Sequence, residues 1–176
     1  QVPDSHQRLT RQGFIGLGKI EDYSAGVVFR HEHTMPAPKK DRLQVLTHTG
    51  AHFGQVFMLY PDPENEVDRE LAEATQTTPL VDVTDEYGAR HRLWAITDPA
   101  RIARIQECMA PMKLLIADGH HRYETALNYR NAHPENPAAQ SVMMTFVNMH
   151  SPGLKILATH RVLRNVSHLR VEELLA

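Results

Sequence analysis

The amino-acid sequence predicts an α+β protein, with a mixed, largely antiparallel sheet and helices packed on it. Strand-like apolar runs and helical segments are interspersed along the 176 residues, without the regular alternation of a doubly wound fold. Two apparent hairpins, within 79–97 and 141–163, require antiparallel neighbours. A chain of this length can bury one substantial core, so we expect 1–176 to form a single domain.

Three apolar runs near the beginning predict strands, at GFIGLGKI (13–20), AGVVFRHEHT (25–34) and FGQVFMLY (53–60). The second run turns polar, and the alternation of a strand would put His31 and Glu32 on opposite faces. Pro36 and Pro38 predict a break in regular structure after it. A helix is expected over 39–52.

Later segments continue in the same interspersed way. Further strands are predicted on both sides of the turn Glu86-Tyr87-Gly88 and at 113–117, 141–149 and 155–163. Further helices are predicted at 66–76, 98–112, 121–133 and near the end, in VSHLRVEELLA. Asp98 as N-cap and Pro99 as the first helical residue mark the clearest helix start. The missing initiator Met and the uncapped last helix lead us to expect an internal fragment of a longer chain.

Composition excludes several classes of protein. The net charge of −2 gives no electrostatic reason to expect a nucleic-acid or anionic-lipid partner. Cys108 is the only cysteine, which excludes an internal disulfide framework and a zinc site built on thiolates. No apolar run approaches the length of a membrane span, and the first residues, QVPDSHQRLTRQ, lack the apolar core of a secretory signal. We therefore expect a cytoplasmic protein without haem, flavin or structural zinc; the sequence does not indicate its oligomeric state.

The segment LLIADGHHRYETAL (114–127) carries the clearest functional pattern, because an apolar run ends in a polar turn and a helix follows. The first N–H groups of a helix lack intrahelical partners and favour an anion. Gly119 would let a ligand approach the main chain, and Arg122 offers a planar bidentate donor. His120 and His121 add donors, so we predict a phosphate site at Gly119, His120, His121 and Arg122. Asp118 is a candidate magnesium ligand, base or helix cap.

A second group of reactive side chains lies in RHEHTMPAPKKDR (30–42). Glu32 among cations is a candidate general base, since proton transfer needs an acceptor close to a substrate hydroxyl. Candidate substrate-binding or supporting residues there are His31, Thr34, Lys40, Asp41 and Arg42. Zinc on His31 and His33 is disfavoured, because the segment breaks as a strand into prolines.

Each pattern also has an ordinary structural interpretation. An Asp-Gly pair before a helix is a common turn with an N-cap, and Arg122 would then only pair with a surface acid such as Glu21 or Glu124. The segment 30–42 would be a solvated loop after an edge strand. The sequence leaves these interpretations open.

Several motifs together resemble the prokaryotic family called domain of unknown function 1015 (DUF1015). They are IADGHHR, RQGFIGLGKIEDYSAGVV, RHEHTMPAPKKDRL, GQVFMLY and RHRLWAITDP, in the order of the family. The DGHHR turn is also similar to the phosphate-binding turn of the ParB/sulfiredoxin-like fold, to which free-serine kinases belong. That resemblance implies phosphate contacts by His120, His121 and Arg122, with Glu32 or Asp118 as base or magnesium ligand.

These observations lead to three functional hypotheses. The first is a phosphotransferase that uses Mg²⁺ and ATP or ADP on a small hydroxylated metabolite, with free serine as a candidate. The second is a metal-dependent hydrolase with Asp118, His120, His121 and Glu32 as ligands. The third is a nucleotide-responsive binding module without turnover.

Overall fold

A computed structural model describes residues 9–156 and 164 of the chain. The strands are β1 (Phe14–Lys19), β2 (Val28–Phe29), β3 (Val56–Tyr60), β4 (Val81–Thr84), β5 (Arg90–Leu93), β6 (Leu114–Asp118) and β7 (Ser141–Asn148). The α-helices are α1 (Pro36–Thr49), α2 (Glu66–Ala74), α3 (Pro99–Met109) and α4 (His120–Ala132). Two short 3-10 helices, η1 (Tyr23–Ala25) and η2 (Pro137–Gln140), complete the described elements.

Five strands form one mixed sheet in the order β1-β7-β3-β6-β2. β7 is antiparallel to β1 and parallel to β3, whereas β6 is antiparallel to β3 and parallel to β2. β4 and β5 form a separate antiparallel hairpin, so three of the five ladders are antiparallel. The predicted α+β class and the hairpin within 79–97 are confirmed.

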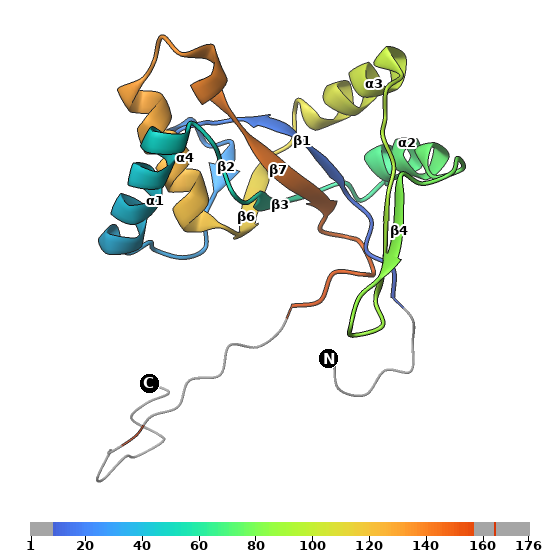
Figure 1. The fold of residues 1–176 in the computed structure, drawn as a ribbon. Coiled ribbons are helices and arrows are strands. Elements are labelled where there is room, and N and C mark those ends of the chain that lie inside the picture. Colours follow the sequence, from blue (N-terminus) through green and yellow to red (C-terminus); the bar gives the residue numbers. More distant parts are fainter. Residues whose placement is uncertain (1–8, 157–163, 165–176) are drawn as a thin grey trace, which may run out of the picture.

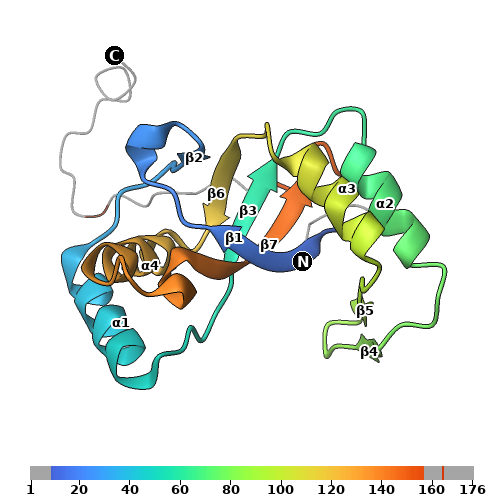
Figure 2. The same ribbon diagram turned by 90° about the horizontal axis from the view of Figure 1, so that it is seen from above.

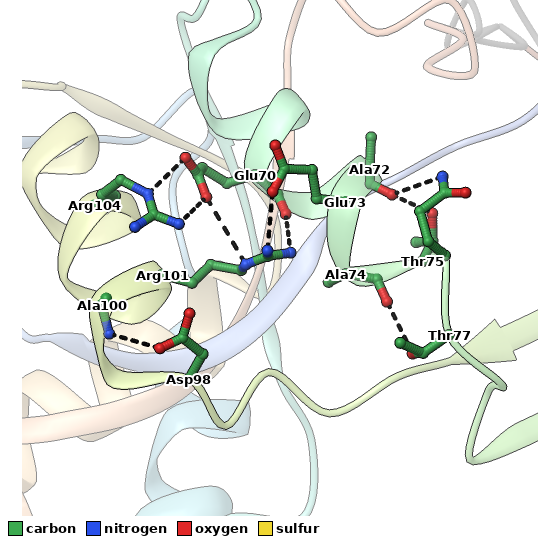
Figure 3. Close-up of polar contacts among 11 residues, drawn as sticks. Glu70, Ala72, Glu73, Ala74, Thr75, Thr77, Asp98, Ala100, Arg101 and Arg104 are labelled. Carbon is green, nitrogen blue, oxygen red and sulfur yellow. Dashed lines mark hydrogen bonds and ion pairs between the residues drawn. The ribbon is translucent and has the colours of Figure 1, made fainter.

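The helices form two pairs at different places on the main sheet (Figures 1 and 2). α1 packs against α4, and α2 packs against α3. Ion pairs link the second pair (Figure 3): the Arg104 guanidinium donates to both carboxylate oxygens of Glu70 at 2.8 and 2.9 Å, and Arg101 Nη2 donates to Glu73 at 2.9 Å. Arg104 and Glu73 are exposed, whereas the Arg101 and Glu70 side chains are 18% and 19% exposed. Pairs with an exposed partner stabilise a fold only modestly.

The core lies between the sheet and the helices. Its largest fully buried side chains include Tyr60, Met58, Ile116, Met144 and Tyr123. The first four come from adjacent strands β3, β6 and β7, and the last from α4. Burial of this apolar surface is the main favourable contribution to folding.

A network of buried polar groups links the end of β7 to α2. Asn148 at the end of β7 is fully buried, and its Nδ2 donates to the Asp62 carbonyl at 2.8 Å and to the Asp68 carboxylate at 3.1 Å. The Asp62 carboxylate in turn accepts the N–H groups of Glu66 and Val67, at the start of α2. This network joins the sheet to α2.

Two expectations about the segment before α1 were wrong. The strand predicted over 25–34 ends at Phe29, so the residues after it do not alternate across a sheet face. α1 begins at Pro36 instead of residue 39. Pro36 and Pro38 both fall in the first helical turn, where main-chain N–H groups have no intrahelical acceptor, so proline is tolerated there.

The predicted hairpin between 141–149 and 155–163 falls partly outside the described residues, and the helix predicted near the end falls entirely outside them. Within the described sheet, β7 pairs with β1 on one side and β3 on the other. Both edges of β7 are therefore occupied by these strands. No helix in residues 9–156 has the length and apolar character needed to cross a bilayer.

Candidate functional site

The parallel pairing of β2 with β6 brings the two polar segments together. After β2 the chain continues past the end of β6 and the start of α4. His31 Nδ1 lies 2.9 Å from the Ile116 carbonyl oxygen, although these residues are 85 positions apart. The Thr34 hydroxyl donates to Glu124 of α4 at 2.5 Å. The residues of 30–35 and 118–124 therefore form one site.

α4 starts directly after β6, and Gly119 is its N-cap at a φ of +96°. This left-handed conformation strongly favours glycine. No side chain caps the helix. The first N–H groups of α4 are thus left for a ligand or for water, and the helix dipole favours a negative charge at that position.

Arg122 folds back over the turn from which it emerges. Its Nη2 lies 2.5 Å from the Asp118 carboxylate, and its Nη1 donates to the Gln55 carbonyl. The guanidinium packs so closely on Gly119 and Gly54 that a Cβ at either glycine would come within 3.1 Å of it. Asp118 is exposed and has Arg122 as its ion-pair partner.

A small hollow of about 230 Å³ lies beside Gln55 and is lined by Arg11, Gln55, Phe57 and Thr145. The Arg11 guanidinium stands 5.6 Å from the centre of the Phe57 ring, and Phe57 pairs with Asp118 in the sheet. Arg11 is therefore a second cation at the same level of the sheet as the Asp118–Arg122 pair. It was not among the predicted site residues.

His120 is buried inside the site. The residue is 1% exposed, and its ring meets that of His31 edge-on, with the ring centres 4.5 Å apart. Glu32 Oε1 lies 2.9 Å from its Nδ1 but outside hydrogen-bond geometry, so this nitrogen has no hydrogen bond among the described residues. Burial lowers the pKa of His120, the Glu32 carboxylate opposes that shift, and His31 adds to it. The imidazole is accordingly neutral near pH 7.

The remaining predicted residues occupy different places. His121 Nε2 accepts the Met35 N–H at 3.0 Å, which ties the start of α4 to the start of α1. Lys40, Asp41 and Arg42 are exposed on α1. The lysine that reaches α4 is Lys39, whose Nζ donates to Glu124 at 2.8 Å.

Comparison with known proteins settles the family. The sequence model of a family described as "Protein of unknown function (DUF1015)" matches residues 1–176. The chain belongs to the DUF1015 family. No curated protein and no solved structure matches it. The similarity of its turn to ParB/sulfiredoxin-like proteins therefore stays a prediction.

In this DUF1015 chain, sequence reasoning missed the role of Glu124, which it treated only as a surface acid. Glu124 is 7% exposed, and its carboxylate accepts hydrogen bonds from Thr34, Lys39 and Arg30. Burial would raise the pKa of Glu124, but Lys39, Thr34 and Arg30 outweigh it, so the pKa is lowered. The signal in the sequence was an acid within the run YETAL, whose other residues are apolar or small, together with cations in 30–42.

A larger hollow among the described residues of the DUF1015 chain lies elsewhere. It measures about 1200 Å³ and is lined mainly by apolar parts of β1, β5 and α3, including Leu17, Leu93 and Ile105. None of the residues at 30–35 or 118–124 lines it. Volume alone does not identify a reactive site, and we place the chemistry where the titratable groups converge.

Proposed function

We propose that this DUF1015 protein is a nucleotide-dependent phosphotransferase that acts on a small hydroxylated metabolite, with free serine as the first candidate. One juxtaposition carries the proposal. Arg122 lies in the first turn of a helix that no side chain caps, and the exposed Glu32 carboxylate lies against His120 in that same turn. Phosphoryl transfer requires these two elements, an anion-binding cradle and an acceptor for the hydroxyl proton.

The nucleotide phosphates bind at the start of α4. Its first N–H groups, the partial positive charge of the helix and the Arg122 guanidinium all favour an anion there. Arg11 adds a further positive charge from the hollow beside Gln55. This cradle consists of main-chain groups and guanidinium groups, which fits phosphate oxygens better than it fits a neutral ligand.

Asp118 is a suitable partner for Mg²⁺. Magnesium is commonly held by one or two carboxylates together with phosphate oxygens and water, and Asp118 is an exposed carboxylate beside the cradle. When a magnesium–nucleotide complex binds, Asp118 would exchange Arg122 for the Mg²⁺ ion. Arg122 would exchange Asp118 for a phosphate group, so neither charge would be left without a partner. Bound there, Mg²⁺ would spread the negative charge of the transferring phosphoryl group.

Glu32 accepts the proton of the substrate hydroxyl. The hydroxyl oxygen then forms a bond to the terminal phosphorus, while the bond from that phosphorus to the bridging oxygen breaks and its electron pair leaves with the nucleotide. His120 is neutral and packs against the Glu32 carboxylate, and so helps to position the base. Glu32 is about half exposed, which leaves its other oxygen accessible to a substrate.

The test is a product assay with hydroxyl amino acids and sugars, Mg²⁺ and ATP or ADP, followed by ³¹P NMR. We expect a phosphorylated product from wild-type protein, loss of at least about 100-fold in kcat for Glu32→Gln, and weaker nucleotide binding for Arg122→Ala. Arg69→Ala, an exposed arginine on α2, is the matched control. Nucleotide binding without any phosphorylated product would overturn the proposal and favour a binding module.

A further inference from the structure

Three metal-ligating side chains converge beside the phosphate cradle. His31, Glu32 and His120 each present a ligand atom, and these atoms all lie within 4.8 Å of one another. His31 and Glu32 come from the segment after β2, and His120 is the first residue of α4. This set differs from the one predicted for a hydrolase, because His31 replaces Asp118 and His121. Asp118 pairs with Arg122, and His121 binds the main chain of Met35.

His120 gives the strongest indication of a missing partner. Its Nδ1 is buried and has no hydrogen bond in the described part of the chain, whereas its Nε2 has only a long contact of 3.5 Å from the His31 N–H, which an ion on Nδ1 would displace as Nε2 takes the proton. A buried polar nitrogen without a partner is costly and rare in native proteins. The nitrogen points into the group that contains Glu32, whose Oε1 is 2.9 Å away but off the hydrogen-bond direction.

That separation resembles the spacing of two ligands on one ion. Two ligand atoms bound at about 2.0–2.1 Å to a tetrahedral zinc ion lie roughly 3.3 Å apart. The largest separation in the group is greater, but the exposed Glu32 side chain can rotate toward the buried nitrogen. Only His120 is fixed by burial.

His31 is already oriented as a ligand. Its Nδ1 lies 2.9 Å from the Ile116 carbonyl oxygen, an acceptor only, so Nδ1 carries the proton and donates. The lone pair is then on Nε2. Histidines that bind metals usually donate their other ring N–H to a carbonyl or carboxylate in this way, which fixes the tautomer and the ring orientation.

We propose that His31, Glu32 and His120 bind a divalent transition-metal ion such as Zn²⁺. Two imidazoles and one carboxylate suit zinc and its first-row neighbours, whereas Mg²⁺ prefers oxygen ligands only. Three protein ligands leave at least one coordination position, and the exposure of His31 and Glu32 opens that position to water. The ion would therefore lie next to the position that we assign to the substrate hydroxyl.

This inference goes beyond the proposed phosphotransferase and does not rest on it. The ion would take an oxygen of Glu32, the carboxylate to which we assign proton acceptance. Metal binding and proton acceptance by Glu32 would then compete for the same group. Whether a metal ion is bound thus determines whether Glu32 can accept the proton of the substrate hydroxyl.

The experiment measures binding of the metal alone, without nucleotide or substrate. Protein stripped with a chelator is titrated with Zn²⁺ in competition with a chromophoric chelator, and Co²⁺ is added separately to record its visible absorption. We expect one ion per chain, and a loss of affinity of at least about 10-fold, the size that even outer-shell changes cause, in His31→Ala and in Glu32→Gln. His48→Ala, an exposed histidine on α1, is the control and should bind as wild type does.

His31 and Glu32 are exposed, so their variants should fold even if His120→Ala does not. The absorption of bound Co²⁺ should change in both variants. Absence of stoichiometric binding to wild type, or unchanged affinity in both variants, would overturn the inference. Because no nucleotide is present, these results are independent of whether phosphotransfer is ever observed.

Discussion

Glu124→Gln tests whether the buried carboxylate of α4 holds the site together. The substitution keeps the size and shape of the side chain and removes its charge. In the native protein the two oxygens accept hydrogen bonds from Lys39 at 2.8 Å, Thr34 at 2.5 Å and Arg30 at 3.2 Å. Glutamine has one acceptor oxygen, so at least one of these donors would face the amide NH₂ group.

The size of the effect follows from burial. The Glu124 side chain is 9% exposed, whereas Lys39 is 26% and Arg30 41% exposed, so the cations recover part of their hydration when the charge is removed. We allow about 1 kcal/mol each for the Lys39 and Thr34 bonds and about 0.5 for the more exposed Arg30. The free energy of unfolding should therefore fall by about 2–3 kcal/mol, which lowers Tm by about 4–12 °C in a chain of this length.

Thermal and urea unfolding at pH 7 measure this change, with Glu107→Gln on the exposed face of α3 as a control for loss of one negative charge. The pH dependence gives a second readout. The pKa of Glu124 is lowered on folding from its ordinary value of 4.5, so its stabilisation is complete above that pH and is lost as pH falls through the lowered value. The difference in Tm between wild type and variant should shrink below pH 4.5. A Tm within a degree of the control at pH 7 would refute the reasoning.

Three further substitutions test other parts of the structure. Gly119→Ala should lower stability by about 1–2 kcal/mol, because φ is +96° there and the new Cβ would press on the Arg122 guanidinium; unfolding by urea measures it. Asn148→Ala should cost more, about 2–4 kcal/mol, since buried groups at Asp62 lose their partner; a loss below that of Gly119→Ala would contradict the assignment. Glu70→Gln should change Tm less than Glu124→Gln does, and its effect should shrink in 1 M salt, because its partner Arg104 is 45% exposed and salt screens such a pair.

Periodicity and start signals predicted most elements of the fold. Asp98 caps α3 and Pro99 is its first residue, as expected. The Asp98 side chain accepts a hydrogen bond from an N–H group of the first turn that has no intrahelical partner, and proline has no N–H group to leave unpaired there. The strands predicted at 13–20, 53–60, 113–117 and 141–149 agree with β1, β3, β6 and β7 to within three residues, and the turn around Gly88 joins β4 to β5. These features depend on neighbours in sequence, which is why the sequence reveals them.

Features that depend on distant neighbours were missed. Pro38 was interpreted as a break, yet it lies within the first turn of α1, and only the packing of α1 on α4 shows that a helix already exists there. Glu124 was interpreted as a surface acid, because a carboxylate becomes a stable buried group only when cations from another segment reach it. Those cations, Arg30 and Lys39, are 94 and 85 positions away.

The site itself depends on a ladder only two residues long. Val28 pairs with Leu114, and Phe29 pairs with Leu115. Val28 is almost completely buried, whereas Phe29 is 43% exposed. A slip by one residue would exchange these environments and expose Val28, so burial of Val28 fixes the register. That register is what lets His31 reach the Ile116 carbonyl and so brings Glu32 against the start of α4. The apolar alternation of a minimal strand therefore positions the polar residues that follow it, and variants that enlarge or remove the Val28 side chain should disturb the site as strongly as changes within it.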